Sequence, residues 1–548
     1  MTARRIAGPL GAEAAEPLVT FMFDGREVRG VEGEPLAVAL LAAGQPVISR
    51  SFRFHRPRGL MCSTGQCGWC ECEVDGVPSV RSCRVPVRQG LVARGEHAWP
   101  SVGSDALAAL GMVSRWIPPT FYHHRFLRPR RLRKRYLDVI RGFGGRGRLR
   151  IGPRADRLPK RPVHAIETGV LVVGGGPAGL HAAIGAAGAG ARVMLVEAER
   201  AIGTGRDAAL DELGAEAQRV GVDIRTGTTA IGWYDGVVTA LAAGGHLEVS
   251  ARSVVAATGS YDRIPLVPGA DRPGVIAART AIALIERQGV LPGDRALLVG
   301  SGEELARAGE ALTRAGVVEL HGPVPTDALV AIRGTNGVSG ADVRVGGRRQ
   351  HFAADVVVFG DRSPNLDLVL AAGAAIERQG QTLLPVRDAN GRTSVPSLFA
   401  AGSTAGLPIV DASSAAMARS TGKAAARAAL GKRAPARTSA AAAGPSPSPQ
   451  PASTAIARGA IVCFCEDVRA WEIRAEQAAG YGDPELIKRR TGALTGPCQG
   501  KQCLQAFACL TASAGGPDLV SLPTGRPPLR PVRLGDLAAG GEDAGTMP

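Results

Sequence analysis

Leu171-Val-Val-Gly-Gly-Gly-Pro-Ala-Gly179 is the stretch that decides the fold of the middle of the chain. The apolar run 169–173 is typical of a buried parallel strand, Pro177 opens an Ala-rich segment typical of a helix, and residues 192–197 predict a second strand. Strand, turn and helix together indicate a βαβ unit of the dinucleotide-binding kind, in which the first N–H groups of the helix face a pyrophosphate. The glycines of its G-x-G-x-x-G turn are Gly174, Gly176 and Gly179.

An acidic residue completes this nucleotide-binding pattern. Glu197 lies 21 residues after Gly176, at the end of the second predicted strand, where a carboxylate can accept hydrogen bonds from a ribose. The stretch 254–260 predicts an apolar strand ending in Ala-Thr-Gly, which in flavoprotein reductases returns to the dinucleotide. We therefore predict an ADP-containing ligand in a two-lobed body over 163–430. The expected cofactor-binding residues are Gly174, Gly176, Pro177, Ala178, Gly179, Glu197, Thr258, Gly259 and Gly402.

A second βαβ pattern begins at 296 but lacks part of the motif. Gly300 and Gly302 are in place, whereas Leu305 replaces the third glycine. Glu303 and Glu304 put negative charge at the predicted helix N-terminus, where they would satisfy the helix dipole and repel a pyrophosphate. We predict that this lobe is structural and has no NAD(P)H site.

The ten cysteines fall only at 62–83 and 463–509. Cys62-x4-Cys67-x2-Cys70 followed by Cys83 is the spacing of a plant-type [2Fe–2S] site, and zinc is the competing metal. Around it, hairpin turns at Asp24-Gly25 and Asp75-Gly76 and a short helix over 35–43 predict a ferredoxin-like β-grasp domain over 17–100. Cys72 shares a strand face with Cys70, so it could substitute as a ligand, but we expect it to be a buried small side chain.

The second cysteine set reads C-x-C, 32 residues, C-x4-C. It resembles the small helical [2Fe–2S] domain related to bacterioferritin-associated ferredoxin, which predicts such a domain over 458–512, again with zinc as the alternative. The implied ligands are Cys463, Cys465, Cys498 and Cys503, and Cys509 is left over.

Electron transfer is the function class that these patterns favour. No cysteine lies between 84 and 462, so the body has no redox-active cysteine pair and disulfide-reductase chemistry is excluded. The nine histidines form no ligand or triad pattern, and we predict no catalytic residue in this chain. The predicted fold is α/β and α+β multidomain, with a body of the pyridine-nucleotide-disulfide-reductase type between two [2Fe–2S] domains.

The remaining segments are connecting in character. The net charge of +16 is concentrated in 125–161, which holds 15 Lys or Arg and only two Asp. We interpret 101–162 as a basic connector, the alternative being a surface that docks onto an acidic partner, and exclude nucleic acid because no base-reading motif is present. The Pro- and Ala-rich segment 431–457 predicts a flexible linker, and 513–548 predicts an extended tail. No apolar run is long enough for a membrane span or a signal peptide, so we expect a cytoplasmic protein whose membrane association, if any, is through partners.

Three further stretches carry a family resemblance: Phe21-Met-Phe-Asp-Gly25, Ser51-Phe-Arg-Phe-His-Arg-Pro-Arg-Gly59 and Pro118-Pro-Thr-Phe-Tyr-His-His-Arg-Phe126. They resemble the N-terminal part of the α subunit of heterotetrameric sarcosine oxidase and of the related opine, hydroxyproline and glycine (cyanide-forming) dehydrogenases. Pro268-Gly-Ala-Asp-Arg-Pro-Gly274 continues the likeness.

This resemblance implies a mechanism shared between subunits. An FAD-containing, amine-oxidase-like β subunit would oxidise the C–N bond of an amino or imino acid, an FMN at the subunit interface would receive the electrons, and two [2Fe–2S] clusters would pass them to a quinone or cytochrome. FAD, NAD and ATP all remain open as the ligand of the first nucleotide site, because Ser403 stands where flavoproteins of this fold commonly have Asp. The chain stops without the family's folate-binding aminomethyltransferase domain, which favours an opine-, hydroxyproline- or glycine-dehydrogenase type. Two other classes stay open, a self-contained NAD(P)H reductase and a scaffold with vestigial cofactor sites.

Overall fold

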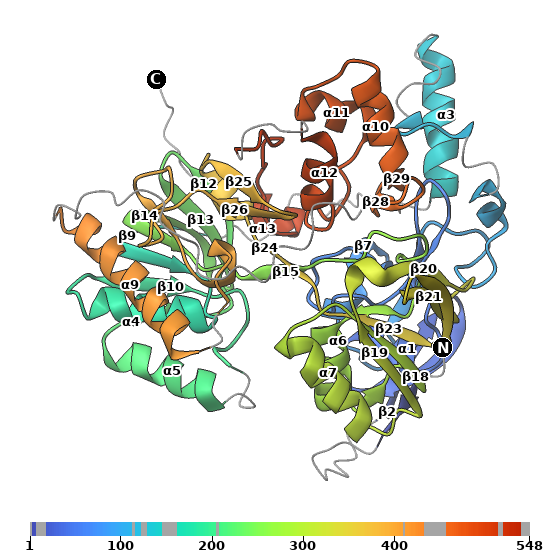
Figure 1. The fold of residues 1–548 in the computed structure, drawn as a ribbon, viewed down its shortest axis with the longest axis horizontal. Helices are drawn as coiled ribbons and strands as arrows, with labels where there is room; N and C mark the ends of the chain where they lie inside the picture. The colour runs from blue at the N-terminus through green and yellow to red at the C-terminus, as the bar shows by residue number, and fades with distance from the viewer. Residues whose placement is uncertain are drawn as a thin grey trace. The chain divides into compact units, whose positions relative to one another are not determined.

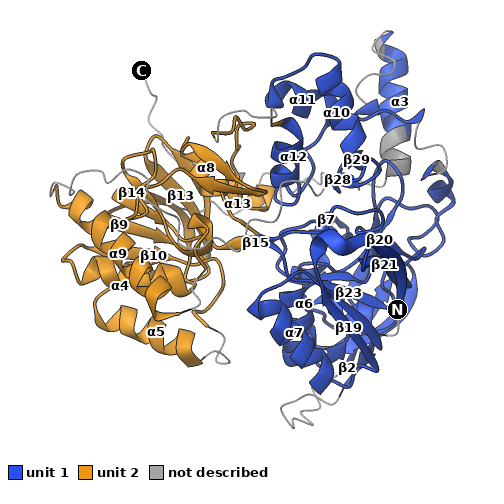
Figure 2. Ribbon diagram, viewed as in Figure 1, with its two compact units in different colours: residues 1–150, 262–362, 453–511 blue, residues 151–261, 363–452, 512–548 orange. Residues whose placement is uncertain are grey.

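The structure is a computed structural model, and it describes residues 3–6, 18–111, 116–121, 129–144, 162–203, 208–408, 411–431, 456–512 and 519–538. The chain divides into two compact units, each assembled from separate sequence segments (Figure 2). Unit 1 contains 1–150, 262–362 and 453–511, and unit 2 contains 151–261, 363–452 and 512–548. Both cysteine sets therefore belong to unit 1, and the first βαβ unit belongs to unit 2.

The N-terminal part of unit 1 is the predicted β-grasp domain. Its five-stranded sheet has the order β3-β2-β8-β6-β7. Both predicted hairpin turns form, and Asp24 and Gly25 have φ of 48° and 76°, the left-handed pair that a tight two-residue hairpin requires. The elements are β2 (Leu18–Phe23), β3 (Arg26–Val31), α1 (Leu36–Ala42), β4 (Ser49–Arg50), β5 (Pro57–Arg58), β6 (Glu71–Val74), β7 (Val77–Arg81) and β8 (Val92–Gly95).

The second lobe of the body also lies in unit 1. A four-stranded parallel sheet of order β16-β23-β18-β19 carries α6 and α7, and a three-stranded antiparallel sheet follows β19. The bounds are β16 (Val275–Ala277), α6 (Ala278–Gln288), β17 (Val290–Leu291), β18 (Arg295–Val299), α7 (Glu303–Arg314), β19 (Glu319–Val324), β20 (Leu329–Arg333), β21 (Gly340–Val345), β22 (Arg348–Ala353) and β23 (Val356–Phe359).

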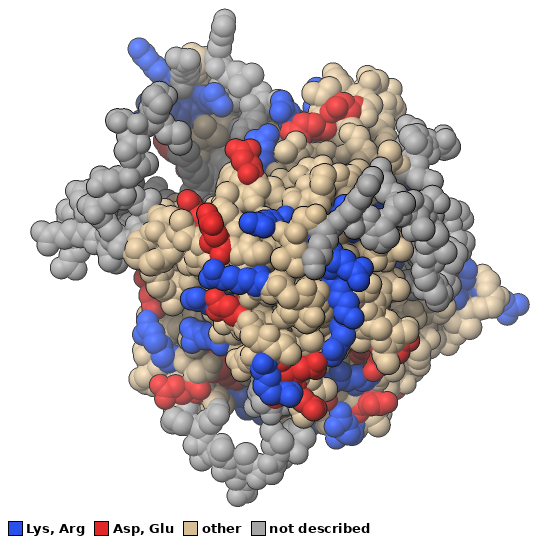
Figure 3. All heavy atoms as spheres, turned by 90° about the vertical axis from the view of Figure 1, so that its left-hand side faces the viewer, with Lys and Arg blue, Asp and Glu red and all other residues tan. Residues whose placement is uncertain are grey.

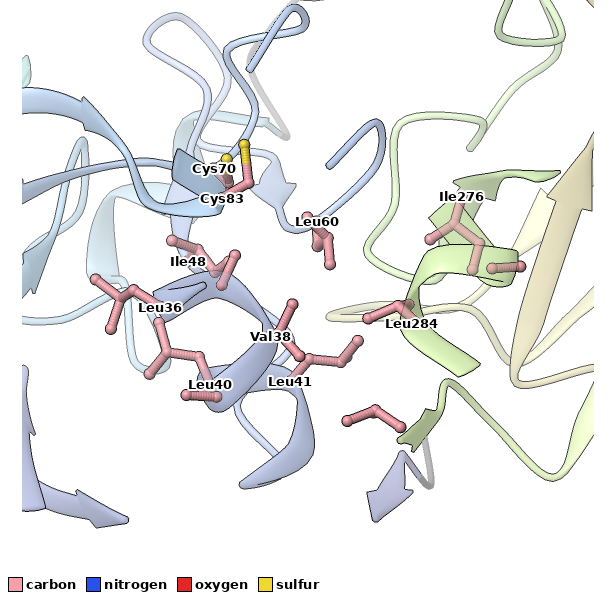
Figure 4. Close-up of a cluster of buried hydrophobic side chains, with 14 of the residues drawn as sticks. Leu36, Val38, Leu40, Leu41, Ile48, Leu60, Cys70, Cys83, Ile276 and Leu284 are labelled. Atoms are coloured by element: carbon pink, nitrogen blue, oxygen red, sulfur yellow. The ribbon is translucent and has the colours of Figure 1, made fainter. Parts of the chain in front are cut away.

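One hydrophobic core joins the ferredoxin-like domain to this lobe. Leu40 and Leu41 of α1 belong to the same buried cluster as Ile276 and Leu284 of the second lobe (Figure 4). The short strand β1 (Arg4–Arg5) adds a second link by pairing with β17. Because burial of apolar surface is the main favourable term in folding, the two segments are expected to fold as one body.

The third segment of unit 1 is a small, mostly helical domain. It consists of β28 (Ile461–Cys463), β29 (Val468–Arg469), α10 (Ala470–Ala478), α11 (Pro484–Thr491) and α12 (Leu504–Thr511). Its core includes Ile473, Ile487 and Phe507, one from each helix. The helices bring the C-x-C and C-x4-C pairs together.

Unit 2 contains a sheet of order β11-β10-β9-β14-β13-β12, with β27 pairing β14. Helices α4, α5 and α9 pack together beside it (Figure 1). Its elements are β9 (Val163–Val173), α4 (Pro177–Ala187), β10 (Val193–Val196), α5 (Ala208–Arg219), β11 (Asp223–Arg225), β12 (Thr229–Tyr234), β13 (Val237–Ala242), β14 (Gly245–Ala256), α8 (Asp367–Ala371), β25 (Ile376–Gln379), β26 (Thr382–Pro385), β27 (Leu398–Ala400) and α9 (Ala412–Ala429). Strands β15 (Ser260–Asp262) and β24 (Arg362–Pro364) stand at two of the places where the chain changes unit.

The tail after 518 runs along unit 2. Leu529 is buried and its N–H donates to the Ile231 carbonyl of β12 at 2.8 Å, and Leu519 pairs with Glu377 of β25. The tail ends in the short helix α13 (Leu534–Ala538), where the Asp536 carbonyl contacts His246.

Charged side chains of both signs occur on the surface, and part of the basic segment 125–161 forms a helix. On the face drawn in Figure 3, acidic side chains are interspersed among the basic ones. Part of the basic stretch is α3 (Arg130–Gly144), whereas 145–161 and most of the 431–457 segment lie outside the described residues. Among the described helices, none has the length and apolarity needed to cross a bilayer.

Candidate cofactor sites

The first cysteine set lies in the loop between β5 and β6 and just after β7. Cys62, Cys67, Cys70 and Cys83 are all buried. Their thiols associate in two pairs, Cys62 with Cys67 and Cys70 with Cys83, through side-chain hydrogen bonds. The Trp69 backbone N–H donates to Cys67 Sγ at 3.4 Å. Gly65 and Gly68 have φ of 73° and 74°, which lets the loop turn its backbone toward the sulfurs.

This pairwise arrangement fits a two-iron cluster. In a [2Fe–2S] cluster with four cysteine ligands each iron takes two thiolates, so two adjacent pairs are needed rather than four side chains around one ion. Within the described residues, no three or more His, Cys, Asp or Glu side chains converge to hold a single metal ion. The hydrogen bond from Cys67 holds the pKa of Cys62 well below its ordinary value, and the hydrogen bond from Cys83 lowers the pKa of Cys70.

The second cysteine set repeats this arrangement between β28 and α12. Cys465 pairs with Cys498, and Cys463 pairs with Cys503. The hydrogen bond from Cys465 lowers the pKa of Cys498 to about 6. A Cβ on Gly496 would overlap Cys465, so the loop must approach the ligand closely at that point. The set has the donors and pairing that a second [2Fe–2S] cluster requires.

The two remaining cysteines stand apart from these pairs. Cys72 lies in β6 with no exposed surface, and burial raises the pKa of its thiol well above the ordinary value. Such a thiol packs as a small apolar side chain. Cys509 lies within α12, half-buried, beyond the C-x4-C loop.

Arg81 connects the loops that carry the two sets. This buried side chain contacts the Gly65 carbonyl of the first loop and lies 3.5 Å from Glu71. The Nη2 atom of Arg81 donates to the carbonyl of Pro497 at 3.0 Å, and Pro497 is next to Cys498 of the second set. One fixed positive charge thus stands between both thiolate sets, a role that could not be predicted from the residue's place in the sequence.

A buried ion network joins two of the stretches that carry the family resemblance, 51–59 and 268–274. Arg58 contacts Asp271 and lies 3.0 Å from Asp467, and Arg56 contacts Asp271 as well. Although burial would raise it, the two guanidinium groups hold the pKa of Asp271 below its ordinary value. Residues 51–59, 268–274 and 463–467 therefore meet at one junction inside unit 1. Arg53 adds a further pair with Glu472 of α10.

The glycine turn lies in unit 2 between β9 and α4, as the sequence predicts. Glu197 accepts a hydrogen bond from the Gly175 N–H at 2.6 Å, so this carboxylate also holds the turn. A Cβ on Gly179 would overlap the Gly174 carbonyl, whereas a Cβ on Gly176 would meet nothing within 4 Å. Gly176 therefore faces open space at the N-terminus of α4, which is where a pyrophosphate would approach.

The other predicted nucleotide-site residues gather beside this turn. A Cβ on Gly402 would overlap Ala178 in the first turn of α4. Thr404 lies 3.2 Å from Thr258 Oγ1 and accepts from the Gly259 N–H at 3.0 Å. Asn365 donates to the Thr258 carbonyl at 3.2 Å. Thr404 and Asn365 were not predicted, because their partners are more than 100 residues away.

The second lobe differs at the corresponding turn. Leu305 is buried, and a Cβ on Gly360 would meet it, so the third position of the motif is filled by core packing. Glu304 pairs with Arg362 at 3.2 Å, and Glu303 begins α7. This arrangement leaves two carboxylates where a pyrophosphate would need N–H groups.

The fold defines a class: a multidomain chain in which a ferredoxin-type [2Fe–2S] domain is joined to a Rossmann-like body. Residues 16–98 match the family described as 2Fe-2S iron-sulfur cluster binding domain, residues 168–320 match pyridine nucleotide-disulphide oxidoreductase, and residues 458–541 match the sarcosine oxidase A3 domain.

Within this class, the chain is similar along nearly its whole length to a sarcosine oxidase alpha subunit, and along two thirds of its length to opine oxidase subunits. It is 30% identical to the alpha subunit of sarcosine oxidase from Rhizobium meliloti, over 95% of this chain and 57% of that protein. It is 26% identical to an opine oxidase subunit from Agrobacterium tumefaciens, over 67% of this chain and 91% of that protein. The chain therefore spans little more than half of its sarcosine oxidase relative. The predicted family resemblance is confirmed.

A solved structure shares the fold. L-proline dehydrogenase from P. horikoshii aligns with a TM-score of 0.66 at 21% identity, over 96% of this chain and 98% of that one. The predicted α/β and α+β multidomain fold class is confirmed.

Proposed function

We propose that this chain is the electron-transfer subunit of an amino- or imino-acid dehydrogenase complex. A partner FAD-containing β subunit would oxidise the substrate, and this chain would carry the electrons through a flavin and two [2Fe–2S] clusters to a quinone or cytochrome. The kinship with sarcosine and opine oxidase subunits supports the substrate class.

The observation that carries this proposal is the placement of both cysteine sets in unit 1. Although they are almost 400 residues apart in sequence, Arg81 contacts the loops of both. A disulfide reductase or a single-site dehydrogenase has no use for two adjacent thiolate sets. An electron relay needs these two sets, because each [2Fe–2S] cluster accepts one electron at a time from a flavin that holds two.

Each site has the residues to hold a cluster. When bound, a [2Fe–2S] cluster takes up and releases one electron at a time. Cys62, Cys67, Cys70 and Cys83 would hold the first, and Cys463, Cys465, Cys498 and Cys503 the second. Trp69 orients its backbone N–H toward Cys67 and excludes water with its buried ring, and Arg81 fixes the spacing of the two loops.

In unit 2, the turn at 174–179 would bind the diphosphate of FAD, or of NAD or ATP, with Glu197 holding the turn and Thr404 and Asn365 holding the 258–259 segment. An FMN, separate from this nucleotide, would lie at the interface between this chain and the β subunit. It would therefore bind only when the β subunit is present.

A reduction experiment tests this proposal. The chain is purified anaerobically with a co-expressed FAD-dependent, amine-oxidase-like β subunit, and candidate amino and imino acids are added without oxygen. We expect the electron paramagnetic resonance signals of reduced [2Fe–2S] clusters to grow as the flavin bleaches, and Arg81→Met to shift both cluster potentials. Arg88→Met, which removes an exposed guanidinium, is the control. Clusters that stay oxidised while the partner flavin is reduced would overturn the proposal.

A further inference from the structure

A cavity of about 300 Å³ lies in unit 1 between the loops of the two cysteine sets. From the ferredoxin-like domain it is lined by Phe52, Gly68, Trp69 and His97, and from the C-terminal domain by Phe464 and Cys465. Of the eight predicted ligand cysteines only Cys465 lines it, so the cavity borders the second cysteine set. Its size is at the lower end of the range for small-molecule sites.

One residue of the cavity wall, Trp69, has a buried hydrogen-bond donor without an acceptor. The Trp69 side chain is 2% exposed, and its indole Nε1–H has no partner. The ring is fixed in place, since Arg58 lies 5.3 Å above it and the Phe464 ring is 5.3 Å away. An unsatisfied buried N–H costs about 1–3 kcal/mol, so a ligand that offers an oxygen here is favoured.

The charged side chains that line the cavity are already paired. Arg58 is neutralised by Asp271 and Asp467, Arg50 lies 3.5 Å from Asp105, and Glu71 faces Arg81. No unpaired charge therefore calls for a phosphate or a carboxylate. Aromatic rings supply much of the apolar wall, and Phe52 is itself stacked on Phe121 at 5.8 Å. The site suits a flat, neutral ligand with a carbonyl oxygen.

The position of the cavity gives this ligand a role. Gly68 and Trp69 lie between Cys67 and Cys70, and Cys465 belongs to the second set, so a bound molecule would be adjacent to both thiolate sets. We propose that the cavity binds the head group of a quinone as the terminal acceptor, an inference that rests on the proposed function. Each quinone would take one electron from each cluster and two protons from water, giving one hydroquinone. The Trp69 indole would donate to one quinone oxygen.

Binding of ubiquinone-1 to the full chain, purified anaerobically and titrated in a calorimeter, tests this assignment. We expect saturable binding that Trp69→Phe weakens about five- to tenfold, because the substitution removes the indole N–H and keeps an aromatic ring. Trp233→Phe in unit 2 is the matched control and should bind as the wild type does. Thr495→Phe adds bulk from the C-terminal domain and should abolish binding.

Two results would overturn the quinone site: no saturable binding, or equal binding by the wild type, Trp69→Phe and Thr495→Phe. Displacement of ubiquinone-1 by FMN would also contradict the assignment to a neutral ligand. Iron content and the paramagnetic resonance spectrum are measured on every sample. If clusters are present but quinone does not bind, the quinone site alone is wrong. If quinone binds to a chain that never assembles clusters, the proposed function is wrong.

Discussion

Gly176 shows how one residue can report on a ligand without disturbing the protein. Its φ of −73° suits any residue, and a Cβ there would meet nothing within 4 Å. The neighbouring glycines of the motif are different, because a side chain at Gly174 or Gly179 would overlap backbone atoms. Gly176 is therefore the position where a substitution should affect only what binds.

We expect Gly176→Val to lower the amount of nucleotide that copurifies by about tenfold or more, because the added methyl groups occupy the approach of the pyrophosphate. Nucleotide released by heat is quantified by chromatography. Iron content should not change, since the cysteine sets lie in unit 1. Gly244→Val, at another glycine with open space around it, is the control. Unchanged nucleotide content would mean that the turn at 174–179 is not a binding site.

At the scale of elements, the junction around Asp271 joins three segments of unit 1. Asp271 is 2% exposed and pairs with Arg56 and Arg58, and Arg58 continues to Asp467. Asp271→Asn would remove one of the two carboxylates that neutralise Arg58 and leave only Asp467. Breaking such a buried pair typically costs about 3–5 kcal/mol, and we expect a loss of that order in the free energy of unfolding of unit 1.

The pH dependence of this loss follows from the lowered pKa of Asp271. The carboxylate stabilises the folded state fully above the ordinary pKa of about 3.9, and this stabilisation falls as the pH falls below that value. The difference in melting temperature between wild type and Asp271→Asn should be constant from pH 7 to about pH 5 and shrink below pH 4. A difference that grew on acidification would contradict the pairing.

The cysteine pairs of the C-terminal domain give a prediction about metal content. With two [2Fe–2S] clusters the chain would contain about four irons, and Cys503→Ser should reduce this to about two. The pairing of Cys503 with Cys463 is confined to the small helical domain, so the first cluster should persist. Cys509→Ser and Cys72→Ser, which alter the two cysteines outside the pairs, should keep the wild-type iron content. Iron loss in Cys72→Ser would show that this buried thiol is a ligand.

The elements that were predicted from the sequence are those whose causes are local. The hairpins at 24–25 and 75–76, the helix after Pro35 and the turn at 174–179 each follow from a few adjacent residues. The contacts that join the cysteine sets could not be predicted in this way, because Arg58 and Asp467 are 409 positions apart. Burial, not local propensity, selects such pairs, and only the folded chain shows that the arginines of 51–59 serve one junction.

For the whole molecule, the division into units changes how the chain is interpreted. The two lobes of the body, which look continuous in sequence over 163–430, fall into different units, and the second lobe shares its core with the ferredoxin-like domain. This lobe supports α1 and the first cysteine loop. Leu305 is part of that shared core.

The second lobe leads to a prediction about NADH. We expect NADH, added anaerobically to the purified full chain, to leave the visible absorbance of flavin and clusters unchanged, because Leu305 and the carboxylates of Glu303 and Glu304 occupy the turn that a pyrophosphate would need. Dithionite added to the same sample is the control, and it should bleach both chromophores. Rapid bleaching by NADH would identify the chain as a self-contained reductase and remove the need for a substrate-oxidising partner.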